Sequence, residues 1–357
     1  MIFYYSIWAF ISFFSLFASN KPEFRIFFLG TLFFLSLMTG FRFEIGGDWN
    51  NYLSIYDLFE ELSFADSLLI TDPSYGFLNY LSHQFGIVDT IFVNFCCALV
   101  FYSCLYFVCK GMKNYWILLL VSFPYLILVV SMGYTRQSVA IALVILAFKY
   151  GLDNKYWKLI FLSLFAISFH KSAIVVLMLY PFLIFQGNFF NNKVIFYTYT
   201  FFSFLFMSFL IYISSISGEN IYTSQDSALS STGAIFRIVV HFLPLFFYIA
   251  HHSKIKKIIE NKIYVFDYLS LLIVFSLALA IPYSTLSDRF NLYLIIFDIF
   301  VFTSLAESLK SSNKLIMIGS IIFFNSLMLI IWMNFGTWSH AWLPYQNYIS
   351  NYLLRVI

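Results

Sequence analysis

The sequence predicts an all-α polytopic membrane protein with about 12 transmembrane helices and both termini outside. Of the 357 residues, 61% are hydrophobic and 10% are charged, with a mean hydropathy of +0.85. Soluble domains carry about 25% charged residues. Apolar runs of about 20 residues recur along the chain, each long enough to cross a bilayer as a helix. A β-barrel would show short alternating segments instead, so the spanning elements are expected to be helices.

The apolar runs define the expected elements in chain order. We expect membrane spans at 2–17, 26–41, 88–108, 115–132, 137–150, 159–169, 172–185, 194–214, 235–250, 263–283, 290–306 and 315–335. The N-terminal run lacks a basic leader and a small-residue cleavage site, so we interpret it as a retained helix. Several runs near 133–185 are short, which predicts short or broken helices there. The chain is expected to form one integral membrane domain, 1–357, with outer loops 42–87 and 214–234 on the substrate side.

The connections between these runs divide the basic residues into two sets. The larger set occupies alternate connections and holds 14 of the 20 Lys and Arg residues: Lys21, Arg25, Lys110, Lys113, Lys149, Lys155, Lys158, Lys193, Lys254, Lys256, Lys257, Lys262, Lys310 and Lys314. The smaller set is Arg42, Arg136, Lys171, Arg237, Arg289 and Arg355. Cytoplasmic loops carry the excess of Lys and Arg. The larger set is therefore expected inside, and the acidic loop 43–72 outside.

The outer basic set is mostly arginine, whereas the inner set is mostly lysine. Ionisable residues at the ends of membrane helices usually face the bundle interior and mark a substrate path. The rigid guanidinium fork suits bidentate contact with phosphate oxygens, which a lysine cannot make. Together the outer arginines favour a polyanion site on the outer face. For each arginine alone, an interfacial anchor or a pair with the acidic loop is the alternative.

Motifs for nucleotide or metal chemistry are absent from the sequence, which has no P-loop, GxGxxG, HExxH or paired CxxC. The four cysteines share one apolar run and are expected to be small buried hydrophobes. We expect no metal, no cofactor and no nucleic-acid partner. The energy for any reaction must then reside in the substrate or in an ion gradient. A lipid-linked phosphate or pyrophosphate donor fits these features.

Four segments resemble the EpsG/Wzy polymerases of bacterial surface polysaccharides. These are "RFEIGGDWNNY" (42–52), "GYTRQSVAIALVILAFKY" (133–150), "SFHKSAIVVLMLYP" (168–181) and "SDRFNLYL" (287–294). The family shows Arg-x3-Gly-x-Asp-x3-Tyr after its second helix, then Arg-Gln leading a helix, then Phe-His-x-Ser/Thr-Ala. Arg42, Gly46, Asp48 and Tyr52 match the first of these motifs.

The resemblance implies a GT-C-like glycosyltransferase in the bacterial cytoplasmic (inner) membrane. It would polymerise undecaprenyl-pyrophosphate-linked repeat units of O-antigen lipopolysaccharide, capsule or exopolysaccharide, moving the growing glycan onto a sugar hydroxyl at the periplasmic face. Its expected partners are that lipid-linked oligosaccharide, membrane lipids, a chain-length regulator and a flippase. The alternatives are a lipid-linked oligosaccharide flippase or transporter, which would place polar groups along the full membrane depth, and an O-antigen ligase.

The segment 40–57, "GFRFEIGGDWNNYLSIYD", carries the first group of candidate residues. Arg42 is expected to pair with pyrophosphate or to hold Asp48. Asp48 is expected to take the proton of the acceptor hydroxyl or to orient an arginine, and the alternative is a helix N-cap. Trp49 is expected to offer a stacking surface for sugar, and Tyr52 to share a face with Asp48. The two glycines permit a sharp turn or a close approach to an anion.

The second and third matching segments supply the other catalytic candidates. Arg136, followed by Gln137, begins an outward-facing helix, where an arginine can stabilise charge on the departing pyrophosphate. His170 at an outer turn is expected to act as general base or to hydrogen-bond a phosphate. The alternatives are an interfacial anchor for Arg136 and a satisfied polar cap for His170.

The last candidates lie in the C-terminal half of the chain. Arg237 and His241 are four residues apart, so they are expected on one face of the helix 235–250 as a further wall of the site. Arg289 is expected to form a local pair with Asp288 or to contact phosphate. The Ser/Thr/Asn/Gly-rich loop 214–234 is expected to bind sugar or to be a plain connection.

The predicted orientation can be tested by cysteine labelling. A cysteine introduced by Ser227→Cys should react with an impermeant thiol reagent added outside intact cells, and one introduced by Lys256→Cys should not. The native cysteines provide the background, measured on the unmodified chain. The reverse labelling pattern would remove the case for an external site.

Overall fold

The structure is a computed structural model that describes residues 1–17, 22–185, 189–216 and 233–351. The described residues are helical, and the one β-type contact among them is an isolated antiparallel bridge between Arg42 and Asn347. The predicted all-α class is therefore confirmed for this part of the chain. Arg355 and most of the loop 214–234 lie outside the described residues.

Within the described part of the chain, seven helical segments are long and apolar enough to cross a membrane. They are Glu23–Gly40, Ile91–Cys109, Trp116–Gly133, Thr135–Leu152, Ala234–Ala280, Ser284–Ser308 and Ser311–Phe335, and four shorter apolar helices are Ile2–Phe17, Tyr156–Phe169, Lys171–Ile184 and Lys193–Phe209. Ala234–Ala280 contains two expected runs, so every expected run has a helical counterpart. The protein is a multi-pass membrane protein, while 12 crossings and external termini stay predictions.

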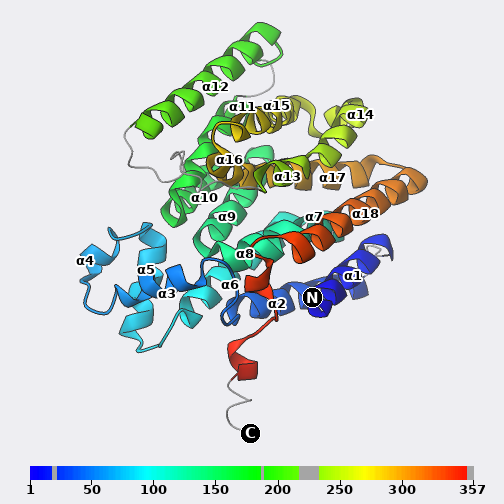
Figure 1. Ribbon diagram of the computed structural model, residues 1–357. Coiled ribbons are helices and arrows are strands. Elements are labelled where there is room, and N and C mark those ends of the chain that lie inside the picture. The colour runs from blue at the N-terminus through cyan, green and yellow to red at the C-terminus, as the bar shows by residue number, and fades with distance from the viewer. Residues whose placement is uncertain (18–21, 186–188, 217–232, 352–357) are drawn as a thin grey trace. The chain divides into compact units, whose positions relative to one another are not determined.

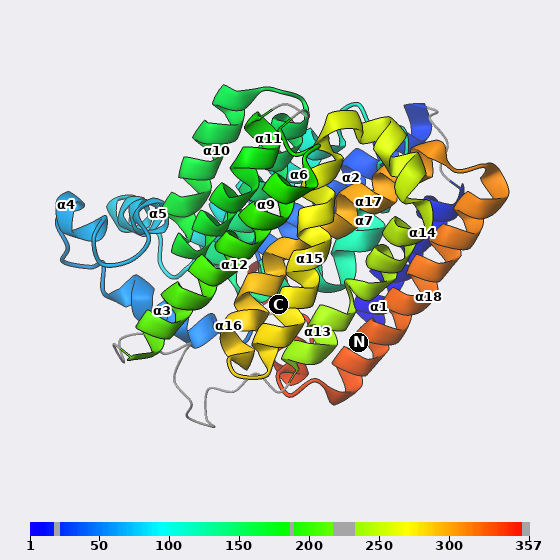
Figure 2. The same cartoon turned by 90° about the horizontal axis from the view of Figure 1, so that it is seen from above.

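The chain divides into two compact units, each described here by itself. Unit 1 comprises Met1–Lys149, Lys158–Ile174 and Ser311–Ile357. Its main elements are α1 (Ile2–Phe17), α2 (Pro22–Gly40), α3 (Trp49–Asp57), α4 (Phe64–Ser67), α5 (Pro73–Gln84), α6 (Ile91–Cys109), α7 (Trp116–Ser122), α8 (Ser131–Gly133), most of α9 (Thr135–Leu152) and α10 (Tyr156–Phe169), and α18 (Ser311–Phe335). Within unit 1, α3, α4 and α5 gather to one side of the long helices (Figures 1 and 2).

Unit 2 comprises Tyr150–Trp157 and Val175–Lys310. Its elements are α11 (Tyr180–Ile184), α12 (Lys193–Ile216), α13 (Ala234–Val239), α14 (Phe242–Ile259), α15 (Ile263–Ala280), α16 (Ser284–Asn291) and α17 (Ile295–Ser308). Helix α14 packs against α17 and α15, and α16 packs against α15 and α13. The expected single integral domain stays a prediction.

A proline explains an irregular span in unit 1. Between α7 and α8 the chain is π-helical over Phe123–Val130, beginning beside Pro124. Proline has no N–H and cannot bond the carbonyl four residues earlier, which here belongs to Leu120. The Asn325 side chain of α18 donates to that Leu120 carbonyl at 3.5 Å. A neighbouring helix thus satisfies the freed backbone group, as a membrane interior requires.

The region 133–185 contains a short and irregular helical segment, as expected, but this segment is not the predicted helix 137–150. Helix α9 has 18 residues and is a full candidate span, so the short helix predicted at 137–150 is wrong in length. The break lies later, where Lys171–Leu179 is a 3-10 helix followed by the five-residue α11. Pro181 in α11 explains why a regular α-helix does not run through this point.

In unit 1 the lysines of the larger basic set and the arginines of the smaller set lie at opposite ends of α6 and α9. Lys149, near the end of α9, donates to the carbonyls of Phe107 and Lys110 at the end of α6, both at 2.8 Å. Arg42 instead contacts the starts of the same two helices. This polarity agrees with the division of charge in the sequence, and its direction across the membrane stays a prediction.

The predicted outer loop 42–87 is largely helical, because it contains α3, α4 and α5. The C-terminal segment 336–351 folds against the start of this loop. Phe43 N–H donates to the Gln346 carbonyl at 3.0 Å, and Gly46 N–H donates to the Ala341 carbonyl at 3.0 Å. Gly46 has φ +110°, and a Cβ there would overlap the Met132 carbonyl oxygen. The first glycine of the pair is thus needed for a turn and a close backbone approach.

Replacing these two neighbouring glycines separates their roles. Gly46→Ala should destabilise the folded protein by about 1–3 kcal/mol, because it adds a Cβ to a left-handed residue pressed against backbone. Gly47→Ala is the matched control, since a Cβ there would lie 3.9 Å from its nearest neighbour and φ is ordinary. Thermal unfolding in detergent, followed by size-exclusion chromatography, measures the difference. Equal midpoints for both variants would contradict this assignment.

Candidate functional site

Arg42 is buried at the point where α2 ends, with 1% of its surface exposed. Its Nη2 donates to Asn94 Oδ1 at 3.0 Å and to Thr135 Oγ1 at 2.7 Å. Its Nη1 and Nε donate to the carbonyls of Thr39 and Ile45 at 2.8 and 3.3 Å. Four of the five guanidinium N–H groups are thus used within the chain. The structure favours a role for Arg42 in holding helix ends together, and these bonds do not include Asp48.

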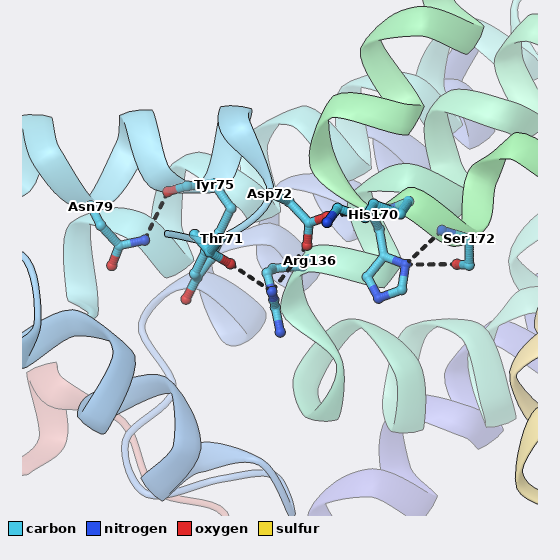
Figure 3. Close-up of polar contacts among 8 residues, drawn as sticks. Thr71, Asp72, Tyr75, Asn79, Arg136, His170 and Ser172 are labelled. Carbon is cyan, nitrogen blue, oxygen red and sulfur yellow. Dashed lines mark hydrogen bonds and ion pairs between the residues drawn. The ribbon is translucent and has the colours of Figure 1, made fainter. Parts of the chain in front are cut away.

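Arg136, the second residue of α9, is held from one side. Its Nη1 donates to Thr71 Oγ1 at 2.7 Å and pairs with Asp72 Oδ2 at 3.0 Å (Figure 3). The guanidinium carbon lies 6.0 Å from the ring centre of Tyr52 and 5.5 Å from that of Tyr75. Its Nε is buried and has no hydrogen-bond partner among the described residues. The guanidinium is therefore oriented by its Nη1 bonds and by a side-chain contact with Tyr52, whereas Nε has no partner in the described chain.

Asp72 joins three elements of unit 1. It precedes Pro73 at the start of α5, a typical capping position, yet its side chain makes no capping bond. One carboxylate oxygen pairs with Arg136, and the other accepts from the Lys171 N–H at 3.3 Å. Asp72 thus links Arg136 to the turn that carries His170. Sequence reasoning missed this role, because the Asp-Pro pair indicates the start of a helix and not the contacts with Arg136 and Lys171.

His170 lies in the turn between α10 and the 3-10 helix that follows. Its Nδ1 accepts from the Ser172 N–H at 3.3 Å and lies 2.6 Å from Ser172 Oγ. This pattern assigns the ring proton to Nε2, so the neutral imidazole is a donor at Nε2. The His170 ring and the Arg136 guanidinium lie on either side of Asp72 and extend to the same side of it (Figure 3). Of the two predicted roles, hydrogen bonding to phosphate fits this tautomer better.

Tyr52 lies between the charges of Asp48 and Arg136. Its N–H bonds to the Asp48 carbonyl at 3.0 Å, which confirms that the two residues are one helical turn apart. Burial raises the pKa of Tyr52, while the Arg136 charge lowers it and the Asp48 charge raises it. Asp48 and Arg136 therefore each lie within electrostatic reach of Tyr52. Asp48 occupies the N-cap position of α3, but its side chain makes no capping bond.

Trp49 does not provide the exposed stacking surface that the sequence suggested. It is only 7% exposed. Its ring packs against those of Phe43 and Tyr348, at centroid distances of 6.0 and 6.4 Å. The reason is the C-terminal segment, which contributes Tyr348 and covers this side of α3. Trp49 is a packing residue.

The remaining candidates belong to unit 2, except Gln137, which is buried in α9 of unit 1. The expected helix 235–250 is interrupted at 240–241, so Arg237 lies in the last turn of α13 and His241 precedes α14. Arg237 pairs with Asp288, and the expected local pair of Asp288 with Arg289 stays a prediction. Arg289 lies half-buried in α16.

His241 and Asp298 form a buried pair in unit 2, with His241 Nδ1 2.7 Å from Asp298 Oδ2. The structure thus gives Arg237 and His241 separate carboxylate partners. Their predicted role as a further wall of the site stays a prediction. The described residues contain no group of three or more His, Cys, Asp or Glu side chains suited to a metal.

Taken together, the unit 1 residues form a partly buried polar centre around the Arg136–Asp72 ion pair. Arg136 supplies an oriented guanidinium, His170 a ring N–H, and Asp48 a nearby carboxylate. The tyrosine rings of Tyr52 and Tyr75 flank the guanidinium and limit its contact with water, which strengthens its attraction for an anion. Such a centre can bind a phosphate group and stabilise negative charge on a leaving group.

The EpsG family model matches residues 25–347, which covers most of the chain and all candidate residues named above. The chain has no match among curated proteins and none among solved structures.

Arg42→Lys should lower stability, because a lysine cannot replace four donors that point in three directions. The groups left without a partner should cost about 1–3 kcal/mol each. Arg25→Lys, an exposed arginine of unit 1, is the matched control and should leave stability unchanged. The measurement is the thermal midpoint of both purified variants against the unmodified protein. An unchanged midpoint for Arg42→Lys would show that the network is not needed for folding.

Proposed function

We propose a function for this chain, which belongs to the EpsG family. That family is associated with exopolysaccharide biosynthesis. The protein is a polysaccharide polymerase of the GT-C type in the bacterial cytoplasmic membrane. It transfers the growing glycan from undecaprenyl pyrophosphate onto a sugar hydroxyl of the next lipid-linked repeat unit. The reaction takes place at the periplasmic face.

The observation that carries this proposal is the arrangement around Arg136. Its Nη1 is committed to Thr71 and Asp72, while its Nε is a buried donor without a partner. Buried donors without partners are rare in proteins and often belong to binding sites. A pyrophosphate oxygen would satisfy this donor, and the Nε–Nη2 edge of a guanidinium is a bidentate fork for phosphate.

The proposed reaction assigns a part to each of three side chains. The acceptor hydroxyl oxygen attacks the anomeric carbon of the growing glycan, and its proton passes to the Asp48 carboxylate. The bond between that carbon and the pyrophosphate oxygen breaks, and the oxygen keeps the electron pair. Arg136 and the Nε2–H of His170 stabilise the charge that develops there. The bond to pyrophosphate supplies the energy, in keeping with the absence of nucleotide-binding motifs.

Transport of lipid-linked oligosaccharide is the second candidate, and one observation favours it. The pair His241–Asp298 is buried within two apolar segments of unit 2, Ala234–Ala280 and Ser284–Ser308. Ionisable pairs inside membrane segments are typical of transport paths. Gene deletion separates the candidates: loss of a polymerase leaves single repeat units on surface lipid, whereas loss of a transporter leaves none.

Arg136→Lys should reduce polymerisation by about 10²–10³-fold, because it keeps the charge but loses the fork that contacts the leaving group. The glycan ladder of cells that carry the variant should collapse to short products. Lys256→Ala, an exposed residue of α14, is the control and should keep the normal ladder. Membrane levels of both variants must match that of the unmodified protein.

A normal ladder from Arg136→Lys at matched membrane level would contradict the pyrophosphate-binding role. Arg136 would then be an anchor for α5 and α9 through Asp72. Deletion that removes all surface glycan would instead favour the transport candidate.

A further inference from the structure

The burial of Trp49 leaves the outer end of unit 1 without the sugar-stacking aromatic that the sequence suggested. A different tryptophan, Trp338, lies beside the motif that contains Gly47 and Asp48. It follows α18 in the C-terminal segment and is 62% exposed. A Cβ on Gly47 would lie 3.9 Å from Cε3 of Trp338, so the indole ring lies in contact range of the Gly-Gly-Asp turn. Both residues belong to unit 1.

Polar side chains accompany this exposed ring. The imidazole of His340 lies 5.9 Å from the Trp338 ring, tilted by 31°, and is itself exposed. Asp48 follows Gly47 directly, and Asn51 Nδ2 lies 3.5 Å from Asp48 Oδ1 on an exposed face of α3. An aromatic face bordered by carboxylate, amide and imidazole groups is suited to a ligand that is apolar on one face and polar at its edge.

We propose that Trp338, with His340, is a stacking subsite for a pyranose ring of the lipid-linked glycan, next to Asp48. The inference rests on the proposed function and names where the acceptor sugar lies. One face of a pyranose carries C–H groups that pack on the negative face of an indole ring. Its hydroxyls project from the edge, where Asp48 and Asn51 can bond them. The subsite thus brings an acceptor hydroxyl to the carboxylate that takes its proton.

The backbone around the subsite is fixed before any sugar binds. Trp338 lies between the end of α18 and the bond from Gly46 N–H to the Ala341 carbonyl. The buried Trp342 donates to the Leu128 carbonyl at 2.9 Å. A rigid aromatic platform loses little conformational entropy on binding, which favours affinity. An exposed tryptophan in a membrane protein can also contact lipid headgroups instead of sugar. The test distinguishes sugar contact from lipid contact.

The direct test is ¹⁹F NMR of the full-length protein labelled with 5-fluorotryptophan. The probe is the free repeat-unit oligosaccharide prepared from the host's own surface polysaccharide. The Trp338 resonance, assigned by its loss in Trp338→Phe, should shift and saturate as the oligosaccharide is added. The Trp157 resonance is the internal control, because Trp157 is 85% exposed but lies in unit 2, and it should not shift.

Glycan ladders provide the second readout. Trp338→Leu should lower polymerisation by about tenfold, the effect of losing one aromatic stacking contact. Phe335→Leu, three residues earlier at the same end of α18 and 81% exposed, is the matched control and should keep the normal ladder.

An unshifted Trp338 resonance at saturating oligosaccharide overturns the subsite, even if Trp338→Leu shortens the ladder, because the residue is then an interfacial anchor. Deletion of the gene that removes all surface glycan, rather than leaving single repeat units, overturns the polymerase proposal instead. In that case a shifted Trp338 resonance still supports the sugar subsite.

Discussion

The hydrogen bonds of Arg42 determine where the candidate residues of unit 1 lie. This one guanidinium joins the end of α2 to Asn94 near the start of α6 and to Thr135 at the start of α9. Because Arg136 is the next residue after Thr135, its position depends directly on that bond. Burial lowers the pKa of Arg42 from its ordinary value, and a charge in such a place is tolerated only with its donors satisfied. Arg42 thus fixes the start of α9, where Arg136 lies.

Features carried by local sequence could be predicted, while those that depend on distant contacts could not. Apolar runs and the arrangement of lysines and arginines indicated the helices and the two ends of α6 and α9. The Asp48–Tyr52 spacing indicated a shared helical face. The role of Asp72 could not be found in this way, because its partners Arg136 and Lys171 are 64 and 99 residues away. The prediction of an exposed Trp49 was wrong for the same reason, because its ring is covered by Tyr348, which is far away in the sequence.

The ion pairs of the two units differ in whether they leave hydrogen-bond donors of the basic residue without a partner. In unit 1 the pair Arg136–Asp72 uses only Nη1 of the arginine, so the guanidinium is oriented while Nε has no partner in the described chain. In unit 2 the pair His241–Asp298 is buried on both sides and holds α17 beside the start of α14. Breaking a buried pair of that kind by removing one partner is costly, because it leaves an uncompensated buried charge.

The bridge between Arg42 and Asn347 also has a consequence for how the protein is made. The two segments it joins are separated by nearly the whole described chain, so the bridge can form only after α18 has left the ribosome. Until then the turn around Gly46 lacks its partner carbonyl at Ala341. Synthesis of the earlier helices therefore precedes assembly of this surface, and the turn around Gly46 is completed only when the last helix has been made.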